Sequence, residues 1–237
     1  MLGIVVTSYQ PHFFLYQDLL LSNLDRNKFK PIFLCSHENH KFVEMIGKNI
    51  KTPLYYLDTN PGKHDGTYTL VSSVVSEFED CDYVLHYHAD NWFRDGTQMI
   101  EKTYKEMLMK KWKVAGVPRQ WVFDDNLKHN DKTIPFHFDF CMMRGDLFRN
   151  IFKMELLNKW KQMSVENGHP SKQFEPCLYA GLVENGVDID KDIYYTDSIR
   201  GLKDRFGDDV VYYNFFFEDS GFFHYDQTAF EKGVHKD

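Results

Sequence analysis

Apolar runs and helix-like stretches alternate along the first half of the chain. The apolar runs that read as buried strands occupy residues 2–8, 31–36, 53–57, 82–88 and 114–118. Between them, apolar residues recur at helical spacing in residues 11–24, 41–48, 71–78 and 97–111. Strands that alternate with helices in this way predict an α/β fold with a mostly parallel central sheet and helices on both faces.

The pattern changes in the second half of the chain. The elements expected there are a long polar loop, a strand, a long helix and a further helix, at residues 121–135, 136–143, 146–163 and 171–184. No repeat and no low-complexity linker separates the halves, so we expect a single domain, residues 1–237, whose halves are residues 1–119 and 120–237.

Composition narrows the class of protein. With 43% hydrophobic and 27% charged residues, the 237-residue chain has the make-up of an ordinary globular protein. Its net charge of −7 argues against a nucleic-acid-binding protein, which would show a basic patch. The four cysteines form no CxxC pair and are expected to be free thiols in a reducing compartment. No apolar run is long enough for a membrane span or a leader, so we expect a cytoplasmic location.

Side chains able to bind ligands gather at the end of the fourth predicted strand. Ligands of open α/β sheets bind beyond the carboxyl ends of the strands. His86, His88 and Asp90 occupy alternate positions there, so the two histidines and potentially Asp90 share one face. Asp90 can hold a divalent cation that neutralises a nucleotide diphosphate, and Mn²⁺ tolerates imidazole as well as carboxylate. The alternatives are a hydrogen-bonded core histidine at His86, the same at His88, and a merely solvated carboxylate at Asp90.

The residues before this cluster give it a family resemblance. Lys63–Tyr68, which contains a glycine, is followed by the valine-rich helix and then by Asp82–Asp90. This order resembles the central block of GT-A fold glycosyltransferases, where a glycine-containing loop, a helix and a strand lead to an acidic DxD motif. Asp90 corresponds to the last Asp of the motif, and His88 stands where the family has the first. The resemblance implies a GT-A-like (Rossmann-like) fold and a hexosyltransferase activity.

The resemblance also implies the ligands and the residues that hold them. The donor would be a nucleotide-sugar, most simply a UDP-sugar, and the acceptor a carbohydrate or other hydroxyl compound. Residues 1–119 would bind the donor and residues 120–237 the acceptor. Donor-binding roles fall on Thr7, Ser8, Tyr9, Asp65, Gly66, His88 and Asp90. Mn²⁺ or Mg²⁺ would be held by Asp90, His88 and the C-terminal His224.

Two carboxylates are candidates for the catalytic group. An inverting transferase needs a carboxylate that takes the proton from the acceptor hydroxyl. Glu175 is expected in the first turn of a helix, where it serves either as this base or to compensate the helix dipole. Asp139 lies among phenylalanines and must have a partner; it is either catalytic or part of an ion pair with Arg144 or Arg119.

Two other functions fit the same cluster. The spacing of His86, His88 and Asp90 resembles the HxHxD pattern of metal-dependent hydrolases, although Asn91 stands where that pattern continues with histidine. A non-catalytic module that binds a nucleotide or a carbohydrate is the third interpretation. Turnover with a sugar-nucleotide donor would separate the transferase from both.

Overall fold

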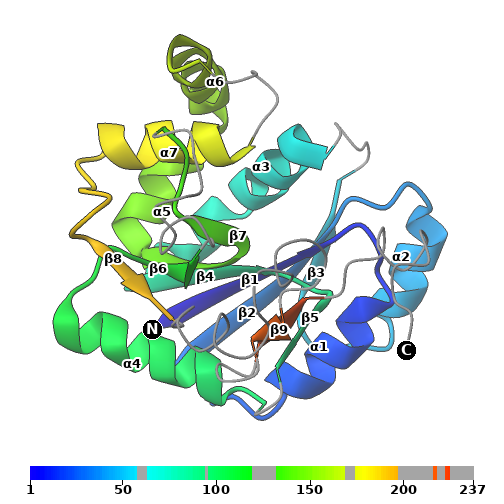
Figure 1. Cartoon of the computed structure of the whole chain (residues 1–237). Coiled ribbons are helices and arrows are strands. Elements are labelled where there is room, and N and C mark those ends of the chain that lie inside the picture. The colour runs from blue at the N-terminus through cyan, green and yellow to red at the C-terminus, as the bar shows by residue number, and fades with distance from the viewer. Residues whose placement is uncertain are drawn as a thin grey trace.

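The computed structural model describes residues 1–57, 63–93, 96–118, 132–168, 174–196, 216–217 and 222–224. A seven-stranded sheet with the order β3-β2-β1-β4-β7-β6-β8 forms its centre (Figure 1). Its strands are β1 (Leu2–Ser8), β2 (Phe29–Cys35), β3 (Leu54–Tyr56), β4 (Tyr83–His88), β6 (Val114–Pro118), β7 (Phe136–Arg144) and β8 (Ile193–Tyr195). All neighbouring strands are parallel except the two pairs that β7 makes. The mostly parallel sheet expected from the sequence is therefore confirmed.

Helices cover both faces of this sheet (Figure 1). They are α1 (Phe13–Leu21), α2 (His40–Gly47), α3 (Lys63–Ser73), α4 (Gln98–Lys110), α5 (Gly145–Ile151), α6 (Leu157–Glu166) and α7 (Phe174–Glu184), with short 3₁₀ turns η1 (Val75–Phe78) and η3 (Met154–Leu156). The apolar residues of α1, α2 and α4 join one buried cluster, and those of α3, α5, α6 and α7 join the other. The sheet is thus the middle of three layers, as the alternating pattern predicts.

The central strand β1 shows why an unbroken apolar run builds this sheet. Ile4 and Val6 face the cluster of α1, α2 and α4, whereas Val5 faces the opposite cluster, and all three are fully buried. Gly3 is needed for close packing, since a Cβ there would lie 2.3 Å from the Phe78 ring. A strand buried on both faces gains from apolar residues at every position.

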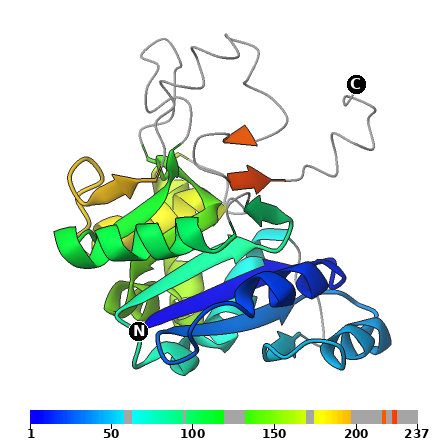
Figure 2. The same cartoon turned by 90° about the horizontal axis from the view of Figure 1, so that it is seen from below.

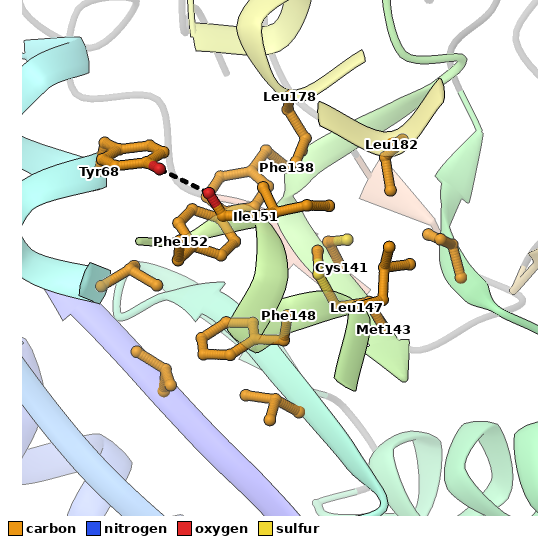
Figure 3. Close-up of a cluster of buried hydrophobic side chains, with 14 of the residues drawn as sticks. Tyr68, Phe138, Cys141, Met143, Leu147, Phe148, Ile151, Phe152, Leu178 and Leu182 are labelled. Carbon is orange, nitrogen blue, oxygen red and sulfur yellow. Dashed lines mark hydrogen bonds between the residues drawn. The ribbon is translucent and has the colours of Figure 1, made fainter. Parts of the chain in front are cut away.

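Figure 3 shows the cluster on the α5 and α7 side of the sheet, where Phe138 and Cys141 of β7 meet Phe148 and Ile151 of α5. The Tyr68 hydroxyl of α3 donates to the Ile151 carbonyl, and the Trp160 indole donates to the same oxygen at 2.9 Å.

The two hydrogen bonds to the Ile151 carbonyl explain why the helix expected from the sequence is interrupted. A single helix was expected over residues 146–163, but α5 ends at Ile151 and α6 begins only at Leu157. The side chains of Tyr68 on α3 and Trp160 on α6 satisfy the Ile151 carbonyl, so it does not need the next turn of a helix.

Strand β7 enters the sheet between β4 and β6 and runs antiparallel to both. Its register with β4 pairs Tyr83 with Arg144 at one end and Tyr87 with Phe140 at the other. The central residues of β7 therefore lie beside the carboxyl end of β4.

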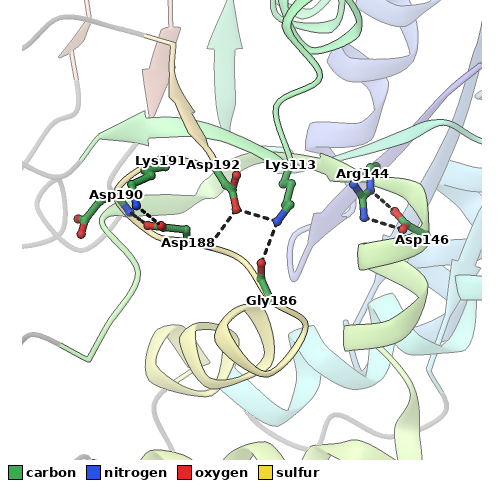
Figure 4. Close-up of polar contacts among 8 residues, drawn as sticks. All are labelled: Lys113, Arg144, Asp146, Gly186, Asp188, Asp190, Lys191 and Asp192. Atoms are coloured by element: carbon green, nitrogen blue, oxygen red, sulfur yellow. Dashed lines mark hydrogen bonds and ion pairs between the residues drawn. The ribbon is translucent and has the colours of Figure 1, made fainter.

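The turn from α7 to β8 is held by charged side chains (Figure 4). Lys113, which precedes β6, donates to the Gly186 carbonyl and to Asp192, both at 2.8 Å. Asp192 also accepts from the backbone N–H of Asp188 at 2.8 Å. These bonds set β8 beside β6, where the two strands pair in parallel.

A second, three-stranded sheet forms at the end of β4. It consists of β5 (Asn91–Phe93), β9 (Phe216–Phe217) and β10 (Phe222–His224), with β10 in the middle (Figure 2). No such sheet is expected from the sequence. It brings a C-terminal segment of the chain to the predicted ligand site.

The structure also bears on the state of the cysteines and on membrane-spanning helices. All four cysteines are free, as expected, and all four are buried. Among the helices of the described residues, none combines the length and the apolar character needed to cross a bilayer.

Candidate functional site

The predicted site lies where β1, β4 and β7 run side by side. Thr7 of β1 is the register partner of His88 at the end of β4. One step beyond the last β4–β7 pair, the same register places His88 beside Asp139. Three residues named from the sequence thus form a row across three strands. Thr7 and His88 were expected at the donor, and Asp139 was a catalytic candidate.

His86 is a fully buried, fully bonded histidine beneath this row. Its Nδ1 lies 3.0 Å from the Phe138 carbonyl, which can only accept, so Nδ1 carries the proton. Its Nε2 must then accept from the Thr7 hydroxyl at 2.9 Å. Burial, with a smaller contribution from the neighbouring His88, lowers the pKa of His86 to about 3. Both ring nitrogens of a neutral imidazole are engaged, which supports the core-histidine interpretation.

This result bears on the hydrolase alternative. A metal site made of His86, His88 and Asp90 would need a free nitrogen on His86. Both of its nitrogens are committed to Thr7 and Phe138. The hydrolase interpretation is therefore not favoured.

His88 is more accessible than His86 and lies in close contact with Asp139. The His88 Nδ1 lies 3.1 Å from the Asp139 Oδ1, with 32% and 25% of the two side chains exposed. The His88 ring meets the His86 ring edge-on at 5.3 Å between centroids, so the two histidines share a face, as expected. A partner for Asp139 was correctly expected, but Arg144 was the wrong choice. Arg144 sits at the other end of β7 and pairs with Asp146. Arg119 lies outside the described residues.

Asp90 sits on a turn that is tied to the body of the protein from several sides. The Ala89 N–H donates to the Thr7 carbonyl at 2.9 Å. The Gln17 side-chain amide donates to the carbonyls of Ala89 and Asn91, both at 2.8 Å, so it holds the residues on either side of Asp90. The Asn91 amide in turn donates to the Asp139 carbonyl. The turn presents Asp90 in a fixed and partly exposed position.

Gln17 was missed in the sequence analysis. It is fully buried on α1, and its Oε1 accepts from the Tyr87 hydroxyl at 2.8 Å, so every polar atom of the amide is used. The available signal was its position. Phe14, Gln17 and Leu21 stand three and four residues apart on the buried face of the helix. A glutamine at such a position must find buried partners.

The backbone of His224 comes next to the Asp90 turn. Strand β10 pairs with β5 so that His224 faces Asn91, the residue after Asp90. Among the side chains that the structure describes, no three His, Cys, Asp or Glu residues are grouped closely enough to hold a metal ion.

The three predicted donor residues at the end of β1 have different surroundings. The Ser8 hydroxyl accepts from the Gln10 N–H and donates to the Gln10 carbonyl, both at 2.9 Å. Tyr9 is half exposed, and its ring lies against that of His37 at 5.2 Å. Thr7 is buried and bonded to His86.

Asp65, Gly66 and Glu175 lie in the layer of α3, α6 and α7. A loop was expected at Asp65 and Gly66, but α3 begins at Lys63, so both lie in its first turn. Asp65 forms an ion pair of 2.7 Å with Lys161 of α6. Glu175 lies in the first turn of α7, as expected.

Two contacts relate this second group to the rest of the site. Phe174 packs against Phe138 at 4.4 Å, and Phe138 stacks on His86 at 4.1 Å, so the start of α7 adjoins the histidine pair. Burial raises the pKa of the Cys177 thiol, and the nearby carboxylates of Asp65 and Glu175 add to the rise. Both carboxylates therefore lie within electrostatic range of the Cys177 thiol.

Solved structures of other proteins identify the fold. No protein-family profile matches the chain, and no curated protein matches its sequence. Solved structures do match. The galactosyltransferase LgtC in complex with donor and acceptor sugar analogs superposes with a TM-score of 0.57 and 12% identity over 96% of this chain and 88% of LgtC. An active-site mutant of LgtC gives a TM-score of 0.54 and 14% identity over 81% of this chain and 72% of its own.

A mannosyltransferase, PcManGT from Pyrobaculum calidifontis, in complex with GDP-Man and Mn²⁺, is more distant. Its TM-score is 0.45 at 11% identity, and this chain spans only 45% of its length. The likeness to LgtC shows that the chain has the GT-A glycosyltransferase fold, as the order of its motifs implied.

Proposed function

We propose that this protein is a glycosyltransferase that moves a hexose from a nucleotide-sugar, most simply a UDP-sugar, to a carbohydrate or other hydroxyl acceptor. The observation that carries the proposal is the Asp90 turn. It lies at the carboxyl end of β4 in a GT-A fold and is clamped by Gln17. His88 precedes it, and the backbone of His224 lies beside it.

The donor set fits a divalent cation. Asp90 offers a carboxylate, and His88 and His224 offer imidazoles, a mixture that Mn²⁺ accepts more readily than Mg²⁺ does. Such a cation would neutralise the charge of the donor diphosphate. Asp90, His88 and His224 would hold it, and Asp65, Gly66, Ser8 and Tyr9 would line the rest of the donor site. Thr7 would lie beneath that site, where its hydroxyl is bonded to His86.

We assign Glu175 the role of the base that takes the acceptor proton. Glu175 stands in the first turn of α7, and its neighbour Phe174 packs against Phe138, the residue that stacks on His86. In this assignment Asp139, the other candidate, contacts His88 instead. In this reaction the acceptor oxygen loses its proton to Glu175 and bonds to the anomeric carbon. The bond from that carbon to the diphosphate breaks, and the nucleoside diphosphate leaves.

The cysteines and the net charge of the chain support two further parts of the proposal, its location in the cell and the class of its partners. The four free thiols suit a cytoplasmic location, and the net charge of −7 suits a partner other than nucleic acid.

The first experiment is a ligand screen by thermal shift. UDP, GDP and their sugars should raise the melting temperature, and more so with Mn²⁺, because a cation held by Asp90 would neutralise the charge of the diphosphate. A ligand at 100 times its Kd stabilises a protein by about 2.7 kcal/mol. If no nucleotide shifted the transition with either metal, the proposal would be abandoned. Binding without turnover would point to the non-catalytic module instead.

The Asp90→Asn variant tests the assigned residue. It removes the charge but keeps the size of the side chain, so we expect loss of the Mn²⁺-dependent shift and of transfer, with the fold intact by circular dichroism. Asp192→Asn is the matched control, since that carboxylate lies before β8 and pairs with Lys113. Near-normal turnover in Asp90→Asn would rule out its assigned role.

A further inference from the structure

The contact between His88 and Asp139 has a consequence for the chemistry of the imidazole. The Asp139 Oδ1 lies 3.1 Å from the Nδ1 of His88. A carboxylate oxygen can only accept, so the proton of a neutral His88 ring resides on Nδ1. The lone pair is then on Nε2. Within the described part of the chain, no hydrogen-bond partner contacts that nitrogen, and about a third of the side chain is exposed.

The surroundings restrict the His88 ring further. The His86 ring packs edge-on against it, and His86 is itself fixed by Thr7 and Phe138. Asp139 is held too, since its backbone carbonyl accepts from the Asn91 amide. The pair therefore stands on three hydrogen-bonded strands and is directly connected to the Asp90 turn.

We propose that Asp139 is a positioning residue that keeps the His88 proton on Nδ1, so that Nε2 serves as a lone-pair ligand for the cation beside Asp90. Asp139 would not itself touch the cation or the sugar. A carboxylate that orients a metal-binding histidine in this way is a common arrangement in metalloproteins, and its loss weakens metal binding by roughly 10- to 100-fold. The cation part of this inference rests on the proposed function, but the tautomer does not.

The tautomer can be measured in the protein without any ligand. Nitrogen-15 NMR of the histidine rings distinguishes protonated from unprotonated Nδ1 and Nε2, and the His88→Gln spectrum identifies the His88 signals. We expect the Nδ1–H form in the wild type. We expect Asp139→Ala to lose it in favour of the Nε2–H form, which an unconstrained histidine prefers. A wild-type ring protonated on Nε2, or an unchanged tautomer in Asp139→Ala, would overturn the proposal.

Metal affinity gives the second readout. Titration of Mn²⁺, followed by electron paramagnetic resonance, should show binding roughly 10- to 100-fold weaker in Asp139→Ala than in the wild type. Asp192→Asn, whose carboxylate is equally exposed at 25% and pairs with Lys113, should bind as the wild type does. Wild-type affinity in Asp139→Ala would contradict the positioning role.

The two readouts also separate this inference from the proposed function. If the wild type showed the expected tautomer but bound neither Mn²⁺ nor any nucleotide, the proposed function and the role of His88 as a ligand would both fall. The contact between Asp139 and the Nδ1 of His88 would stand. If the protein bound Mn²⁺ and UDP but His88 carried its proton on Nε2, only the role of Asp139 would fall.

Discussion

His86 is enclosed between Thr7 and Phe138, and its pKa of about 3 makes the stability of the fold depend on pH. An unfolded chain protonates this imidazole below about pH 6.5, whereas the folded protein does so only near pH 3. Between these values the unfolded state binds more protons, so the free energy of unfolding falls as the pH falls. The contribution of the neutral His86 to the free energy of unfolding is fully present above about pH 6.5.

We therefore predict a loss of about 1.4 kcal/mol per pH unit below pH 6.5 from this residue, or about 2 kcal/mol by pH 5. Urea unfolding between pH 8 and pH 5 measures it. His86→Gln should be less stable at pH 8 but have a shallower pH dependence, because glutamine does not titrate. Equal slopes in the two proteins would show that His86 does not control this effect.

The residues of the site show how far the sequence analysis could reach. His86, His88, Asp90 and Asp139 could be selected because polar side chains stood out in apolar strands. Which histidine was buried and which was accessible depended on the neighbouring strands. The contact between His88 and Asp139 depended on the register of β7, which no local pattern specifies.

At the scale of elements, helix α1 supports the Asp90 turn through the single side chain of Gln17. We predict that Gln17→Met destabilises the protein by about 2–4 kcal/mol, because buried carbonyls of Ala89 and Asn91 lose their donor. The variant should also weaken Mn²⁺-dependent nucleotide binding, since the turn loses its clamp.

Chemical unfolding and thermal shift measure the two effects of Gln17→Met. Gln98→Met is the control, as Gln98 is an exposed glutamine on α4. If Gln17→Met and Gln98→Met had the same stability and the same nucleotide binding, the hydrogen bonds of Gln17 would not stabilise the Asp90 turn.

Some of the helices and strands could be predicted from the sequence, and others could not. Strands β1, β2, β4 and β6 were recognised because they are buried runs of five or more residues. The break after Ile151 was missed because its causes, Tyr68 and Trp160, are remote or lie on the other side of the break. Strands β5 and β10, of three residues each, are too short to show a period.

At the scale of the whole molecule, the four cysteines report on how tightly the two buried clusters are packed. Burial raises the pKa of Cys35 and of Cys81 to about 11, and raises those of Cys141 and Cys177 as well. A rise of two units lowers the thiolate fraction at neutral pH about a hundredfold.

We predict that the native protein reacts with a thiol reagent such as DTNB far more slowly than the unfolded protein, in which all four thiols become available. A stopped-flow comparison with and without denaturant tests this. Rapid reaction of one thiol in the native state would reveal local opening of the cluster that contains it.

The position of β7 in the sheet also affects how the polypeptide can fold while it is synthesised on the ribosome. Strands β1 to β4 can associate as soon as residue 88 has emerged, but the second edge of β4 has no partner until β7 arrives at residue 136. Throughout the synthesis of residues 89–135, that apolar strand presents open backbone groups on which another nascent chain could pair. The antiparallel insertion that aligns Asp139 with His88 thus also creates an interval during translation in which one edge of the incomplete sheet is open to aggregation.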